Sequence, residues 1–252
     1  MAATRRNDIK IILHAPAPVS DDRRPLAIVR AMERAFPGLR LDWTISDEGQ
    51  LVPLPRRDAW FVEQLGNEPF PLVCNGLENG LVTLWGFVAP ASSGPGGQPL
   101  FDVQAKLPLD ANGIAAAGSV LEAVAEAACA FWGHATPFEV MGDIARQTEG
   151  PDGAADPPRG LPALKVPEKI PSPEVPQYLG WLNHWSAAAA RAIGFPDPER
   201  DADLLSRARR TASGGWLVQL TDEPLDLDQP AHLDALKRAY ERFPEIGGRS
   251  RP

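Results

Sequence analysis

The segment of residues 151–176, PDGAADPPRGLPALKVPEKIPSPEVP, constrains the fold most, because it holds eight of the 27 prolines in the chain. Proline has no amide hydrogen and its ring clashes with a preceding helical turn, so neither a helix nor a central strand tolerates this density. We therefore expect an extended, semi-rigid linker between two unequal parts, residues 1–150 and 177–252. Its apolar residues predict that it packs along the body; they are Leu161, Leu164, Val166 and Ile170.

Both flanking parts mix strand and helix patterns. Short runs of β-branched and alternating apolar residues predict strands over residues 9–15, 39–46, 81–88, 100–108, 177–186 and 215–221. Apolar residues at helical spacing predict helices over residues 26–36, 55–65, 114–133, 136–147, 187–193, 197–212 and 230–243. This order predicts an α+β fold, in which an antiparallel or mixed sheet is covered by helices and both parts form one compact unit.

Two local features refine this expectation. In the run TPFE, Thr136 is expected to cap the helix over 136–147, with Glu139 as its reciprocal partner. The loop APASSGPGGQP, between the strands at 81–88 and 100–108, is rich in Gly and Pro and is expected to be mobile.

The chain is acidic, with a formal net charge of −8 and a pI near 5.1. This balance disfavours nucleic acid and anionic membranes as direct partners and favours a basic protein. The first 150 residues hold 12 basic and 18 acidic residues, so most of the excess negative charge lies there. The stretch MAATRRNDIKIILHAPAP has only a four-residue apolar run, too short for a signal peptide or a membrane span. A cytoplasmic protein is expected.

The two cysteines, Cys74 and Cys129, share no short spacing. Cys129 falls on the apolar face of the helix expected over 114–133, so we predict a buried free thiol there and no disulfide. So few cysteines fit a reducing compartment.

Motifs of known chemistry are absent from the sequence. It contains no G-x-x-x-x-G-K-[ST], no H-E-x-x-H, no C-x-x-C and no G-x-S-x-G. We therefore expect no cofactor, no metal and no catalytic residue.

The stretch LTDEPLDLDQPAHLDALKR, residues 220–238, places five acidic residues and one histidine before its first basic residue. A calcium loop needs oxygen ligands at regular positions and a central glycine, but Leu227 and Pro230 interrupt this pattern. Catalytic acid–base work requires burial or a like-charged neighbour, which spacing alone does not indicate. The structural interpretation accounts for more: Asp228 or Gln229 caps a helix that begins at Pro230. A solvated acidic rim remains, formed by Asp222, Glu223, Asp226 and Asp228.

Two alternative functions stay open. An enzyme would need a polar pocket in which two of the residues His134, His184 and His232 converge with carboxylates. A small-ligand binding module would use Trp181 and Trp185 as a stacking platform, although core packing is the simpler interpretation of these indoles. The run RARR, residues 207–210, is expected on a solvated helix face offset by Asp201 and Asp203.

The last third of the chain carries a family resemblance. A G-W strand, a helix of small residues and then GGWLVQLTDEPLDLDQPAHLDALKRAYERF resemble the immunity protein 52 family of bacterial polymorphic toxin systems. The run GLRLDW fits the first third of that family more loosely. The whole chain, including GQPLFDVQAKLPLD, FWGHATP and PPRGLPALK, also looks like a poorly described bacterial family of similar length. The Pro-rich segment and the SSGPGG loop are departures from the immunity family.

The resemblance implies an α+β protein without enzymatic activity that binds a cognate toxin, by family association a nuclease of the restriction-endonuclease fold. A nuclease cleft is basic because it holds phosphates, so an inhibitor gains association rate by presenting carboxylates. Two acidic sites are candidates to face the toxin. One is the rim of Asp222, Glu223, Asp226 and Asp228, and the other is Asp47 and Glu48 in the run SDEG.

Overall fold

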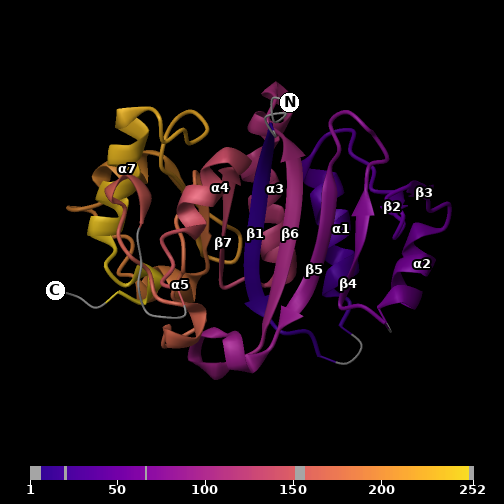
Figure 1. Cartoon of the computed structure of the whole chain (residues 1–252), viewed down its shortest axis with the longest axis horizontal. Coiled ribbons are helices and arrows are strands. Elements are labelled where there is room, and N and C mark those ends of the chain that lie inside the picture. Colours follow the sequence, from indigo (N-terminus) through magenta and orange to yellow (C-terminus); the bar gives the residue numbers. More distant parts are fainter. Residues whose placement is uncertain (1–6, 20–21, 66, 151–156, 250–252) are drawn as a thin grey trace.

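The computed structural model describes residues 7–19, 22–65, 67–150 and 157–249. Its centre is one sheet of ten strands in the order β3-β2-β4-β5-β6-β1-β7-β8-β10-β9 (Figure 1). Every pairing between these strands is antiparallel. Helices cover the sheet, so the predicted α+β class is confirmed.

Most of the strands and α-helices correspond to predicted elements; the exceptions are β3, β4, β7 and β9. The strands are β1 (Asp8–Pro16), β2 (Trp43–Ile45), β3 (Leu51–Pro53), β4 (Phe70–Cys74), β5 (Thr83–Ala89), β6 (Leu100–Pro108), β7 (Trp132–Pro137), β8 (Leu182–Trp185), β9 (Ala208–Arg210) and β10 (Trp216–Gln219). The α-helices are α1 (Arg24–Ala35), α2 (Arg57–Gln64), α3 (Ala111–Ala128), α4 (Phe138–Ala145), α5 (Ala187–Ala192), α6 (Ala202–Ser206) and α7 (Pro230–Arg242). Five 3-10 turns complete the described elements: η1 (Ala91–Ser93), η2 (Pro95–Gly97), η3 (Pro158–Gly160), η4 (Pro167–Lys169) and η5 (Ile246–Gly248).

The side chains of the central strand β1 alternate between the two faces of the sheet. Ile9, Ile11, Leu13 and Ala15 are fully buried, while the alternate residues are half-buried, as a period of two requires. Helices α1 and α3 pack together behind the sheet, and α3 contacts β1, β6, β7 and β8 (Figure 1). The small side chains of α3, many of them alanine, let it lie close to the strands. The opposite face is covered by α4 and by irregular segments.

The described part of the Pro-rich segment, residues 157–176, lies along the body. Leu161, Leu164 and Ile170 are buried, and backbone hydrogen bonds tie Leu164 to Gln147 and Glu149. The Gly- and Pro-rich loop, expected to be mobile, docks on this segment: the Gly96 amide donates to the Ile170 carbonyl over 2.8 Å. Two segments without regular structure therefore support each other.

The region around β7 corrects three expectations. Helix α3 ends at Ala128, and residues 132–137 form a strand that is buried at every position, so no alternating pattern marks it. Thr136 does not cap a helix; its hydroxyl hydrogen-bonds His134 Nδ1 over 3.0 Å. Cys129 is exposed, not buried, because it forms the left-handed C-cap of α3 at φ 54. Both cysteines are free, and Cys74 is buried.

The region around β9 corrects another. The helix expected over 197–212 is only the short α6, and Ala208–Arg210 form the edge strand β9. Arg207 pairs with Asp203 over 2.7 Å, as expected of a solvated pair, but Asp201 is buried and pairs with Arg242 instead. The strands β3 and β4 were not predicted, since three and five residues are too few to show a period.

Candidate functional site

The two acidic candidates lie on different parts of the molecule. Asp47 and Glu48 form the exposed turn between β2 and β3, at one edge of the sheet. Asp222 to Asp228 follow β10, and Leu225 to Asp228 line a pocket with Leu109 and Pro137, next to the ends of the central strands β6 and β7.

The stretch Asp222–Asp228 makes mostly local contacts just before the start of α7. The Asp226 carboxylate accepts from the Asp228 amide over 3.0 Å, and His232 Nδ1 accepts from the Asp226 amide over 3.1 Å. Arg159 pairs with Asp228 over 2.8 Å. Asp222 and Glu223 are exposed, and Leu225 and Leu227 point into the body as expected.

The capping prediction for α7 is wrong in detail. Gln229 occupies the N-cap position, but its side chain makes no capping hydrogen bond, and Asp228 turns toward Arg159. Within the described residues, no group of three or more His, Cys, Asp or Glu side chains is arranged to hold a metal ion.

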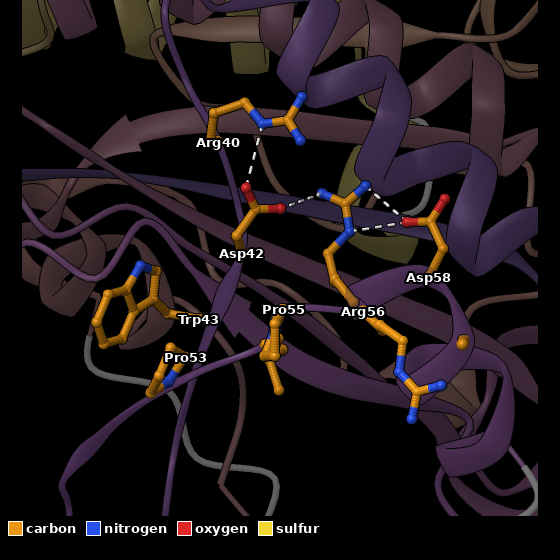
Figure 2. Close-up of a pocket in the computed structure, with 10 residues that line it drawn as sticks. Arg40, Asp42, Trp43, Pro53, Pro55, Arg56 and Asp58 are labelled. Carbon is orange, nitrogen blue, oxygen red and sulfur yellow. Dashed lines mark hydrogen bonds and ion pairs between the residues drawn. The ribbon is translucent and has the colours of Figure 1, made fainter.

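An open groove of about 620 Å³ lies beside the β2–β3 hairpin and the start of α2. Figure 2 shows a chain of ion pairs along it, from Arg40 through Asp42 to Asp58. The guanidinium between the two aspartates belongs to Arg57, which lies 3.5 Å from Asp42 and 2.7 Å from Asp58. Arg56 points away from this chain (Figure 2).

Arg57 anchors the groove, since its side chain is only 8% exposed and also reaches Glu33 of α1. Burial alone lowers the pKa of Arg57, but hydrogen bonds to Asp58 and Glu33 outweigh this and raise it. Hydrogen bonds from Arg30 and Arg57 lower the pKa of Asp58. Arg57 and Asp58 are therefore both held in their charged forms, so the groove suits binding rather than proton transfer.

The same end of the molecule exposes apolar side chains. Five large apolar side chains of the described residues are exposed, and three belong to elements at this end: Val52 in β3, Val62 in α2 and Leu77 after β4. Among the described strands, the edge strand β3 pairs with β2 alone, which leaves the other side of its backbone open to a partner strand. Carboxylates at the turn, an open strand edge and apolar side chains together form what we name the hairpin end.

The histidines do not converge in the way the enzyme alternative required. His134 lies in β7 and not in a turn between helices, and its side chain faces away from α3. His184 pairs with Gly133, the residue before His134, so its side chain lies on the opposite face of the sheet. It faces α3 and lies 3.8 Å from Glu126. His232 belongs to α7. The histidine that lines the same cavity as His134 is His14, which the sequence analysis did not single out.

The alternative hypothesis that Trp181 and Trp185 form a stacking platform for a ligand is also wrong. Trp181 and Trp185 are 3% and 1% exposed, so both belong to the core. Trp181 Nε1 donates to the Thr221 carbonyl over 2.9 Å, and Trp185 packs edge-on against Phe195 and Phe243.

The sequence matches a family model over residues 20–251, described as a domain of unknown function, DUF5953. The chain belongs to the DUF5953 family. Among solved structures, this DUF5953 chain is similar to the Pseudomonas aeruginosa T6SS protein PA0821, with a TM-score of 0.55 and 16% sequence identity. The likeness covers 93% of this chain and 76% of the other, and it extends the fold assignment to nearly the whole length. No curated protein matches the sequence.

The sequence analysis named Asp47 and Glu48 as candidates but did not predict the groove at the same end of the molecule. Arg57 and Glu33 are 24 residues apart, so no local spacing signals their ion pair.

In the part of the DUF5953 chain that the structure describes, no helix is long and apolar enough to cross a membrane.

Proposed function

We propose that this DUF5953 protein is an immunity protein, which binds and neutralises a cognate bacterial toxin in the cytoplasm without catalysing a reaction. The toxin partner is a basic nuclease domain. The hairpin end is the surface that contacts it, and this surface is the observation that carries the proposal.

The hairpin end combines features that favour a protein partner. Its exposed apolar side chains, Val52 and Val62, supply area that gains from burial. The open edge of β3 offers unpaired backbone groups, and a partner strand or loop satisfies them by β-augmentation. The rigid Arg57 network holds the groove in one shape before binding, which lowers the ordering cost.

Charge supports a basic partner. Asp47 and Glu48 stand exposed at the tip, and a hydrogen bond from Ser46 lowers the pKa of Glu48, which keeps it ionised. The net charge of −8 steers a basic nuclease toward the chain from a distance.

Two further observations agree with this role. The last third of the chain resembles the immunity protein 52 family in its strand, acidic turn and final helix. The solved structure that shares the fold belongs to a protein of the T6SS. An immunity protein, which acts in a toxin system without catalysing a reaction, fits both of these observations.

The test uses the toxin encoded beside this protein. Increasing amounts of the purified chain are added to a fixed amount of toxin, and DNA or RNA cleavage is measured. We expect activity to fall linearly and to vanish at a 1:1 molar ratio. Full cleavage in the presence of excess chain would reject the proposal.

A further inference from the structure

A second cavity, of about 430 Å³, lies on the face of the sheet opposite α3. Its floor comes from three adjacent strands: His14 of β1, Asp102 and Gln104 of β6, and Trp132 and His134 of β7. In the sheet register, His14 stands between Asp102 and Trp132, so these side chains share one face.

Helix α4 and the two irregular segments enclose this floor. Met141 and Ile144 form one wall, the loop around Pro95 and the Pro-rich residue Pro167 form the roof, and Tyr178 closes one side. The hydrogen bond between Gly96 and Ile170 joins the two halves of the roof. The Pro-rich segment therefore has a structural purpose beyond linking, since it covers a cavity.

Asp102 is a buried carboxylate without a cationic partner. Its residue is 8% exposed, it accepts from Gln104 Nε2 over 3.0 Å, and His14 Nδ1 lies 3.6 Å away. Among the described residues, no Lys or Arg side chain pairs with it. A buried charge of this kind is unfavourable until a counter-charge reaches it.

Three other titratable groups line the cavity: His14, His134 and Tyr178. Burial lowers the pKa of His14 to about 4 and that of His134 to about 3, and it raises the pKa of Tyr178. All three are thus neutral between pH 5 and 8. Burial raises the pKa of Asp102 to about 6, so near pH 7 the cavity holds one negative charge among neutral rings.

We propose that this cavity binds a small primary amine, with its ammonium group at Asp102 and its apolar body against Met141 and Ile144. An ammonium has three N–H donors. The carboxylate of Asp102, the free Oε1 of Gln104 and a neutral imidazole nitrogen of His14 are acceptors for them. The buried His134 Nε2 has no partner among the described residues, so a second ring nitrogen remains available to the ligand; Trp132 Nε1 is also unpartnered, but it only donates and does not bind an ammonium. This site is separate from the hairpin end, and its test does not involve a toxin.

The experiment measures binding of n-butylammonium, 2-phenylethylammonium and the neutral isostere 2-phenylethanol to the full chain by titration calorimetry at pH 7.5. At least one amine is expected to bind saturably at 1:1 and at least tenfold more tightly than the alcohol. In Asp102→Asn the amine is expected to lose at least tenfold in affinity. The matched control Asp234→Asn, at an exposed position of α7, is expected to bind the amine as the unmodified chain does.

A second measurement on the unmodified chain keeps the proposal testable even if Asp102→Asn does not fold. Amine affinity is expected to fall as the pH is lowered from 7 through 6 to 5, because protonation of Asp102 removes the counter-charge. Saturable binding of neither amine, equal binding of amine and alcohol, or undiminished binding by folded Asp102→Asn would each overturn the proposal.

Discussion

Arg57, the first residue of α2, places its guanidinium 2.5 Å from the carboxylate of Glu33 in α1, and this pair holds the hairpin end against the body. The same Glu33 carboxylate accepts from the Leu41 amide over 2.9 Å, which fixes the chain as it enters β2. One buried ion pair thus determines the position of the surface proposed to meet the toxin.

We predict that Arg57→Met lowers the free energy of unfolding by about 3 kcal/mol, because it leaves the partly buried Glu33 without its close cationic partner. The exposed Arg56→Met is the matched control and should change it by less than about 0.5 kcal/mol. Urea unfolding followed by circular dichroism measures both. Equal stability of the two variants would show that the Arg57 network does not hold this end.

Gly133 in β7 and Gly118 in α3 differ in the space that a side chain would find. A Cβ at Gly133 would lie 2.2 Å from the Leu13 side chain and 2.7 Å from the Ile12 carbonyl. We therefore expect Gly133→Ala to destabilise the protein by about 3 kcal/mol or more. Gly118 lies inside α3, where a Cβ would be no closer than 3.5 Å to its neighbours, so Gly118→Ala should stabilise by about 0.5–1 kcal/mol. Thermal melts of both variants test whether the two substitutions change the stability in these opposite directions.

The buried histidines predict acid sensitivity. The folded-state pKa values of His14 and His134 are lowered to about 4 and about 3, so the unfolded chain binds more protons below pH 6.5. Their contribution is complete above pH 6.5 and is lost at up to about 1.4 kcal/mol per pH unit per histidine as the pH falls toward 4. Asp102 acts in the opposite direction between pH 6 and 4, because burial raises its pKa to about 6.

Stability curves from pH 7.5 to 4.5 measure this balance. The single variants His14→Gln and His134→Gln should each show a flatter loss of stability on acidification than the unmodified chain. A slope that neither variant changes would contradict the assignment of these histidines as neutral and buried.

The cysteines should differ in reactivity. Cys129 is exposed and Cys74 is buried, with its thiol pKa raised by burial. A disulfide reagent such as DTNB is expected to modify one thiol in the native protein and the second only after unfolding. Cys129→Gly should also stabilise the protein by about 0.5–1 kcal/mol, because its backbone is left-handed at φ 54. Two thiols reacting at one rate in the folded chain would refute this placement.

Sequence patterns predicted the elements whose side chains alternate or repeat. Strand β1 and helices α1 and α7 were expected because fully buried positions alternate or repeat with less buried ones, and the second half of β6 follows the same alternation. Strand β7 was missed because WGHATP is buried on both faces between β1 and β8, and its composition suits a helix start equally well.

The sites were harder to predict than the elements. Asp47 and Glu48 were singled out because the SDEG run places two carboxylates in the more acidic first part of the chain. Asp102 and Gln104 alternate visibly along their strand, but their meeting with His14 depends on the β1–β6 register, which no local pattern records. The groove depends in the same way on Arg57 reaching Glu33.

Toxin binding is proposed at the hairpin end. Its most direct test compares two charge-reversal variants, Asp47→Lys/Glu48→Lys and the matched rim pair Asp222→Lys/Glu223→Lys, in calorimetric titrations against the catalytically inactivated cognate toxin. We expect the hairpin variant to bind at least 100-fold more weakly than the unmodified chain, and the rim variant to stay within about threefold. Unchanged affinity of a folded hairpin variant, or a loss confined to the rim variant, would contradict the claim.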